Sequence, residues 1–314
     1  MGVGVFLAVL ILLVDYQKII DLAPFIYFVS LVLLLLVFFV GSERLGAQRW
    51  LSLGPLSFQP SEFIKLSYIL MLGWYLGHKK DSIEGISNII VPMLLLGPAF
   101  VLILIQPDLG TSLILFPIFF AMVYVAGVNL KYILAVFGVG ILSSPFFWQF
   151  LKDYQKNRLL VFLNPNLDPL GAGYTIIQSK IAIGSGYLIG KGWLSGTQNQ
   201  LNFLPERHTD FIFSVVGEEW GFIGSLVVVL LFFVIIYRGL KIINETPDFY
   251  GRLIASGIVA LLSFQIVVNI GMTLGLLPVV GLTLPFISYG GTSIISSMIA
   301  VGILLSISMR RPLF

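Results

Sequence analysis

Nine stretches of this chain are each apolar over about the length that an α-helix needs to cross a lipid bilayer, roughly 20 residues. Of the 314 residues, 58% are hydrophobic and only 11% are charged, whereas soluble domains carry about twice that charged fraction. The sequence therefore predicts an all-α polytopic membrane protein that forms one integral membrane domain over residues 1–314. The nine predicted spans are approximately residues 2–20, 22–41, 61–77, 86–105, 107–127, 131–150, 211–238, 252–277 and 290–308.

The lysines and arginines of the short loops predict the orientation, because cytoplasmic loops carry an excess of positive charge. One set of alternate loops is rich in basic residues, whereas the other holds only Arg44 and Arg49, with Lys65 just inside a helix. We expect the basic set and the C-terminus to be cytoplasmic. The N-terminus would then lie outside, so either an upstream helix is missing or the count of spans differs by one. The basic set is Lys18, Lys79, Lys80, Lys131, Arg238, Lys241, Arg252, Arg310 and Arg311.

The longest segment between predicted spans is residues 151–210, and we expect it to be a structured cap over a cavity outside the membrane. Residues 164–169 carry turn chemistry,. The polar and apolar pattern of residues 173–185 predicts a short amphipathic helix at the interface. The tryptophan, tyrosine and aliphatic content of the segment argues against disorder.

The densest polar cluster of the chain lies in residues 204–213, immediately before the seventh predicted span. It contains Glu206, Arg207, His208 and Asp210. Polar groups at a membrane surface must be solvated, paired or used. Asp210 is a candidate proton acceptor, and its neighbours could bind an anionic, membrane-bound substrate. The alternative is structural, because Asp210 could instead accept hydrogen bonds from the first amides of the helix that follows.

A second candidate pair, Glu62 and Lys65, lies at the start of the third predicted span. The two residues are three positions apart and share one face of a helix. One interpretation is a capping box, with Ser61 as the cap and Glu62 in the first turn. Capping does not explain Lys65, since a lysine one turn into a membrane helix needs a partner, either Glu62 or an anionic ligand.

Polar residues in the predicted outer loops form a third group of candidates. Arg44 and Arg49 with Trp50 could bind a diphosphate or a lipid headgroup, or they could simply anchor the protein at the interface. Residues 288–293, a run of serine, glycine, tyrosine and threonine, could line the outer cavity.

Several polar residues fall within or beside the apolar spans, where polar groups are costly and usually paired. At least one of Glu218 and Glu219 should be buried against a partner, in either a structural or a catalytic role. We expect Asp108, beside the proline that splits two spans, to cap the helix that starts there, although an ion site is the alternative. Gln265 and Asn269 are expected to hold helices together.

Composition excludes several classes of function. The chain contains no cysteine, which excludes disulfides, thiol chemistry and cysteine-bound metal,. Only two histidines are present, so a histidine-based metal site is not expected, and the sequence has no phosphate-binding loop or dinucleotide fingerprint,. The small net charge of +3 gives no indication of nucleic acid binding. The first apolar segment has no Lys or Arg before Lys18 and no cleavage site, so it does not read as a signal peptide.

Taken in order, these motifs resemble the SEDS family (shape, elongation, division and sporulation) of cell-wall polymerases. Residues 192–198 and Arg207 are most similar to its rod-shape branch. Two features depart from the family pattern: the first of the usual ten spans is not evident, and Tyr187 stands where a glycine is usual. The resemblance extends over essentially the whole chain, and the matching stretches are 46–50, 59–65, 106–111, 164–165, 168–169, 173–174, 178–186, 204–213, 217–219 and 285–291.

This resemblance implies a peptidoglycan glycosyltransferase that polymerises lipid II into β-1,4-linked glycan in the bacterial cytoplasmic membrane, with its active site facing outside. Asp210 matches the essential aspartate of the family, Glu62 and Lys65 match its other functional pair, and Arg49 matches a further implicated position. We expect Asp210 to act as the catalytic base. The expected substrate-binding residues are Arg49, Glu62, Lys65, Glu206, Arg207 and His208.

The resemblance also implies partners, namely a class B penicillin-binding protein and other membrane proteins of the elongation machinery. No cofactor is certain. Arg49, Lys65 and Arg207 are the candidate cations for stabilising the leaving undecaprenyl diphosphate, and a divalent cation (Mg²⁺ or Mn²⁺) could share that task. Two other functions stay open. A chain with broken helices and buried charges could be a lipid II flippase, and a non-catalytic scaffold would tolerate changes of Asp210.

Overall fold

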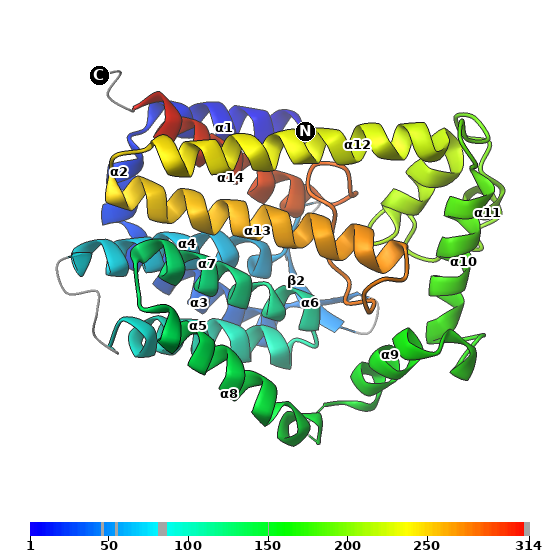
Figure 1. Ribbon diagram of the computed structural model, residues 1–314, viewed down its shortest axis with the longest axis horizontal. Helices are drawn as coiled ribbons and strands as arrows, with labels where there is room; N and C mark the ends of the chain where they lie inside the picture. The colour runs from blue at the N-terminus through cyan, green and yellow to red at the C-terminus, as the bar shows by residue number, and fades with distance from the viewer. Residues whose placement is uncertain (45–46, 54–55, 81–86, 150, 311–314) are drawn as a thin grey trace. The chain divides into compact units, whose positions relative to one another are not determined.

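We describe a computed structural model of the chain, which covers residues 1–314 except 45–46, 54–55, 81–86, 150 and 311–314. The described residues are mostly helical, as Figure 1 shows, which confirms the all-α membrane class. They fall into two compact units, and each unit is described by itself. The first unit comprises residues 1–137, 236–264 and 290–314, and the second comprises residues 138–235 and 265–289.

All nine predicted spans contain helix, and six described helical segments are both long and apolar enough to cross a membrane. The main helices of the predicted spans are α1 (Gly2–Leu13), α3 (Ala23–Val40), α4 (Pro60–His78), α5 (Ser87–Ile105), α6 (Leu109–Leu113), α7 (Leu115–Ala126), α8 (Leu130–Trp148), α12 (Ile212–Glu245), α13 (Phe249–Thr273) and α14 (Gly291–Met309). Helices α8, α12 and α13 contribute residues to both units.

The first predicted span is not one continuous helix. Helix α1 ends at Leu13, and a second short helix, α2 (Tyr16–Asp21), follows. The side chain of Asp15 accepts a hydrogen bond of 3.1 Å from the amide of Gln17 and thereby caps α2. Because a cap stabilises a new helix start, the single span over residues 2–20 is corrected to two helices.

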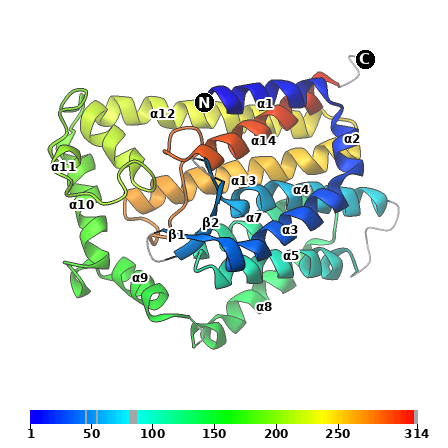
Figure 2. The same cartoon turned by 180° about the vertical axis from the view of Figure 1, so that it is seen from behind.

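A three-stranded antiparallel sheet, which the sequence analysis did not predict, follows α3 in the first unit. It consists of β1 (Ser42–Arg44), β2 (Ala47–Leu53) and β3 (Leu56–Phe58). Figure 2 shows β1 and β2 beside the end of α3. The sheet places Arg49 on β2, whereas the side chain of Arg44 lies outside the described residues, as does Arg311.

Close helix packing in the first unit depends on small residues. Helix α1 packs along α14, and a Cβ added at Gly302 would lie 3.0 Å from the carbonyl oxygen of Ala8. A Cβ added at Gly4 would lie 3.1 Å from Met298. Small residues let membrane helices approach to this distance.

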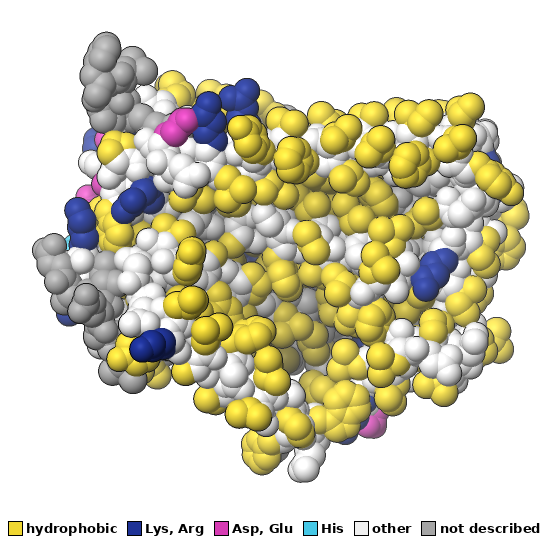
Figure 3. Space-filling model, in the orientation of Figure 1, with side chains coloured by type: hydrophobic (Ala, Val, Ile, Leu, Met, Phe, Trp, Pro, Cys, Tyr) yellow, Lys and Arg dark blue, Asp and Glu magenta, His cyan; other side chains and the backbone are white. Residues whose placement is uncertain are grey.

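Hydrophobic side chains dominate the face drawn in Figure 3, and charged ones are sparse on it, as expected of a surface in contact with lipid.

The segment before α12 in the second unit is folded, as predicted. It contains α9 (Asp153–Leu163), a 3₁₀ turn (Pro165–Leu167), α10 (Ala172–Ser185) and α11 (Thr197–Gln200). In Figure 1, α10 lies between α9 and α11, which agrees with the contacts between these elements. Helix α10 confirms the predicted short helix over residues 173–185.

Helix α12 is interrupted at Gly221, whose φ of 65° and ψ of −159° fall where only glycine is readily accommodated,. The amides of Phe222 and Ile223, after the break, donate to the carbonyls of Tyr187 (2.8 Å) and Leu188 (3.1 Å). Loop carbonyls therefore replace the helical acceptors that the break removes. Tyr187 itself has a φ of 47°, a left-handed conformation that explains why glycine would be favoured at this position.

Candidate active site

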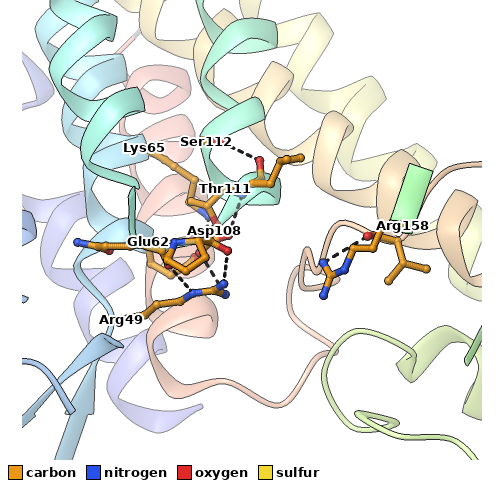
Figure 4. Close-up of polar contacts among 11 residues, drawn as sticks. Arg49, Glu62, Lys65, Asp108, Thr111, Ser112 and Arg158 are labelled. Atoms are coloured by element: carbon orange, nitrogen blue, oxygen red, sulfur yellow. Dashed lines mark hydrogen bonds and ion pairs between the residues drawn. The ribbon is translucent and has the colours of Figure 1, made fainter. Parts of the chain in front are cut away.

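In the first unit, Arg49 is bound to the loop between α5 and α6. Its Nε donates a 2.9 Å hydrogen bond to the carbonyl of Gln106, its guanidinium also donates to the carbonyl of Pro107, and its Nη1 lies 3.9 Å from Asp108 Oδ2. Figure 4 shows Arg49 directed at this loop. Asp108 Oδ1 accepts a 3.1 Å hydrogen bond from the amide of Thr111, which confirms the predicted cap of α6. Arg49 thus stabilises carbonyls that the helix break leaves without amides.

Glu62 and Lys65 form a buried ion pair at the start of α4, with 2.8 Å between Lys65 Nζ and Glu62 Oε1. Their residues are 4% and 1% exposed. The second carboxylate oxygen of Glu62 accepts a 2.9 Å hydrogen bond from Ser296 on α14. The capping interpretation of Ser61 is wrong, because α4 begins at Pro60 and its N-cap is Gln59. Glu62 instead joins α4 to α14 and compensates the charge of Lys65.

In the second unit, the backbone around Asp210 is held by residues that follow Asp210 by 59 to 79 positions in the chain. The side-chain amide of Asn269 donates to the carbonyl of Asp210 at 2.9 Å and also to the carbonyl of Leu282 at 2.7 Å. Ser288 Oγ donates to the carbonyl of Thr209 at 2.7 Å, and the backbone amide of Tyr289 donates to the carbonyl of His208 at 2.7 Å. Three consecutive carbonyls are therefore fixed, that of Asp210 by α13 and those of His208 and Thr209 by the segment after α13.

The carboxyl group of Asp210 lies against a glycine. A Cβ added at Gly281 would be 3.3 Å from Asp210 Oδ2, and Gly281 has a φ of 77°. Asp210 is only partly buried and precedes α12 by two residues. A carboxylate whose backbone is fixed and whose side chain is not fully enclosed is suited to accepting a proton from a bound molecule.

The side chains of the residues preceding Asp210 make hydrogen bonds with one another and with the local backbone. Thr209 Oγ1 donates to Glu206 Oε2 at 3.0 Å and to the Glu206 carbonyl at 3.2 Å, and Arg207 Nε donates to His208 Nε2 at 3.2 Å. Glu206 has a φ of 50°, so the chain turns sharply there. Arg207 and His208 both line a cavity of about 520 Å³ beside the first turns of α12. The structure thus groups four predicted site residues on one loop.

Glu218 is buried against partners, which confirms the prediction for at least one of the two glutamates. Its side chain is fully buried and pairs with Lys191 Nζ at 2.8 Å. It also accepts hydrogen bonds from the amide of Gln198 (2.9 Å) and from Nδ2 of Asn199 (2.7 Å). Both glutamates precede the break at Gly221, so they lie in a short helical segment that the loop covers.

In the part of the chain that the structure describes, no group of three or more His, Cys, Asp or Glu residues could hold a metal ion. Mg²⁺ is usually bound by only one or two carboxylates together with substrate phosphates. The divalent cation therefore stays a prediction, and we derive no step through it.

Two partners of the site were missed by sequence reasoning. Ser296 lies 234 residues from Glu62, and the only local signal is a polar residue on an apolar helix. Asn269 was expected to hold helices together, whereas it binds the carbonyls of Asp210 and Leu282. An amide side chain in a mostly apolar span indicated a buried partner, but not which one.

Fold and site together define a polytopic membrane protein in which groups able to do acid–base chemistry lie at helix ends and in a folded loop. The family model described as cell cycle protein (FtsW, RodA, SpoVE) matches residues 1–312. The chain belongs to this family, as its resemblance to SEDS proteins predicted.

Individual relatives agree with this assignment. The peptidoglycan glycosyltransferase MrdB of Escherichia coli strain K12 is 43% identical over 292 residues, which cover 93% of this chain and 79% of that protein. Stage V sporulation protein E of Bacillus subtilis strain 168 is 39% identical over 317 residues, covering 98% of this chain and 84% of that protein.

Solved structures are similar along the whole chain. A chain from a peptidoglycan synthase complex that coordinates polymerization and crosslinking superposes with a TM-score of 0.84 at 38% identity, covering 100% of this chain and 88% of that one. The rod shape determining protein RodA of Thermus thermophilus gives a TM-score of 0.72 at 33% identity, covering 99% and 85%.

Proposed function

We propose that this chain polymerises lipid II into β-1,4-linked glycan strands for cell elongation and shape, with loss of undecaprenyl diphosphate. Peptidoglycan glycosyltransferase is the activity named for relatives such as MrdB and the RodA of Treponema pallidum strain Nichols. The observation that carries the proposal is the fixed backbone of residues 208–210, which holds the Asp210 carboxylate beside a loop that also carries Arg207 and His208.

Asp210 is the proposed catalytic base. The 4-hydroxyl of an acceptor sugar attacks the anomeric carbon of the lipid-linked donor, and the bond from that carbon to the diphosphate oxygen breaks. The hydroxyl proton passes to Asp210, and undecaprenyl diphosphate leaves as an anion, so the α-linked donor becomes a β-linked product. General base catalysis of this kind contributes about 10²–10⁴-fold to the rate.

A cation should stabilise the negative charge that develops on the leaving diphosphate. Of the three cations predicted for this task, Arg207 fits best, because it lies three residues before Asp210 on the same loop and is only partly buried. Lys65 is 1% exposed and paired with Glu62. Arg49 donates to two loop carbonyls. We therefore assign Arg207 the electrostatic role, and Glu62, Lys65 and Arg49 the role of shaping the first unit.

The proposed location is the bacterial cytoplasmic membrane, with residues 151–210 and Asp210 on the outer side, where lipid II is consumed. The distribution of basic loop residues supports this orientation,. A class B penicillin-binding protein is the proposed partner, since a similar chain occurs in a complex that couples polymerization to crosslinking. Other membrane proteins of the elongation machinery are further proposed partners.

The test is to supply the purified protein with lipid II in detergent and to separate the products by gel electrophoresis. A polymerase produces a ladder of glycan lengths that muramidase digests to disaccharides. A flippase instead moves fluorescent lipid II across proteoliposomes without forming polymer, and that result would replace the proposal.

A further inference from the structure

The second unit contains a cavity that the catalytic proposal does not explain. Its volume is about 520 Å³, within the range of small-molecule sites,. One wall is a single face of α12, and the other walls come from the loop before α12 and from Ile287. It is lined by Trp193, Leu194, Asn199, Gln200, Arg207, His208, Ile212, Val215, Val216, Glu219, Trp220 and Ile287.

Two hydrogen-bond acceptors in the wall of this cavity lack donors among the described residues. Glu219 is 7% exposed, and its carboxylate makes no hydrogen bond or ion pair with any of these residues. Asn199 Oδ1 is buried and accepts no hydrogen bond from them either, while Nδ2 of the same side chain donates to Glu218. Buried acceptors are normally paired, so the wall is suited to a molecule that donates hydrogen bonds.

The mouth of the cavity carries two exposed tryptophans. Trp193 is 70% exposed and Trp220 is 53% exposed, and their rings meet edge to face with centroids 6.0 Å apart. The electron-rich face of an indole attracts C–H groups as well as cations. Arg207 adds N–H donors to the same lining. The cavity therefore combines flat apolar surfaces, unsatisfied acceptors and charged donors.

This combination distinguishes among ligand classes. A diphosphate would place its negative charge beside the buried carboxylate of Glu219, and an isoprenoid chain would leave Glu219 and Asn199 without donors. A sugar offers hydroxyl donors for both acceptors, oxygen acceptors for Arg207, and C–H faces for the indoles.

We propose that this cavity is a saccharide subsite, which holds an amino-sugar unit of the glycan next to the one that reacts. The proposal rests on the proposed function and deepens it. Asp210 lies between His208 and Ile212, both of which line the cavity. A sugar held there would keep the glycan chain aligned with the base, and its loss would shorten the polymer.

The experiment measures binding of a fluorescein-labelled chitotetraose, a β-1,4-linked tetramer of N-acetylglucosamine, to the purified full chain by fluorescence anisotropy. We expect Trp193→Ala and Glu219→Leu each to weaken binding at least tenfold. Trp148→Ala is the matched control, because Trp148 is also exposed but does not line the cavity. It should bind like the wild type. Trp193 is so exposed that its removal should not impair folding, whereas Glu219 tests the interior.

Absence of wild-type binding, or equal binding by wild type and both cavity variants, would overturn the subsite. An Asp210→Asn protein separates this question from the reaction, because it should bind the tetramer normally while its polymerisation rate falls at least 10²-fold. If wild type binds the tetramer yet forms no polymer from lipid II, the polymerase proposal fails and the subsite stands. If polymer forms without tetramer binding, the subsite fails and the polymerase proposal stands.

Discussion

Removal of the Lys65 ammonium should destabilise the protein strongly. Lys65 and Glu62 are 2.8 Å apart, and at an effective dielectric constant of about 20 Coulomb's law gives an attraction of roughly 6 kcal/mol at that distance. Desolvation of the two ions offsets much of this attraction. The variant Lys65→Met nevertheless leaves Glu62 as an uncompensated buried charge, which costs about 3–5 kcal/mol.

The double variant Glu62→Gln, Lys65→Met should recover most of that loss. Without either charge, no buried ion is left unpaired, and the amide of Gln could still accept the hydrogen bond from Ser296. Replacement of a buried pair by neutral residues is often close to neutral for stability. Ser296→Ala alone should cost about 1–3 kcal/mol, since it leaves one oxygen of Glu62 without its donor.

The free energies of unfolding would be measured by titration with SDS in mixed micelles, followed by tryptophan fluorescence. Lys241→Met is the matched control, because Lys241 forms an exposed pair with Glu245 at 3.5 Å, and such pairs contribute only about 0.3–0.5 kcal/mol. The reasoning is refuted if Lys65→Met is as stable as the control, or if the double variant is as unstable as the single one.

Two further predictions concern the second unit. Gly281→Ala should lower the polymerisation rate about tenfold or more, because the added Cβ would lie 3.3 Å from Asp210 Oδ2 and Gly281 has a φ of 77°,. The control is Gly138→Ala, because a Cβ added there meets open space. Equal rates for the two variants would contradict the assigned geometry. Glu218→Gln should lower the free energy of local opening of the loop before α12 by about 1.5–3 kcal/mol. The backbone amide of Asn199 would then exchange its hydrogen faster. Unchanged protection of this amide would show that Glu218 does not anchor the loop.

The sequence predicted the helices well because membrane spans must be long and apolar, and that signal is local. It failed where short local features changed the chain path. Asp15 caps a new helix inside the first apolar stretch, and the strands of residues 42–58 are too short to carry a clear pattern. Ser61 resembled a cap, but Pro60 already occupies the first helical position.

The sequence predicted which residues are candidates for the site, but it did not predict their hydrogen-bond partners. Asp210 and Glu62 stood out as carboxylates in apolar surroundings. Their partners Asn269 and Ser296 are 59 and 234 residues away in the sequence, and a local pattern does not indicate which distant polar groups will meet. The same limit applied to Glu218, whose structural role became evident only from its contacts with the loop.

The central claim is that the Asp210 carboxylate accepts the proton of the attacking hydroxyl, and its most direct measurement is the initial rate of lipid II polymerisation by purified Asp210→Asn protein. The asparagine variant keeps the size and backbone hydrogen bonds of Asp210 but cannot act as a base, so the rate should fall at least 10²-fold. Asp153→Asn, a change of an exposed carboxylate on α9, should retain the wild-type rate. Wild-type polymerisation by a folded Asp210→Asn protein would contradict the account.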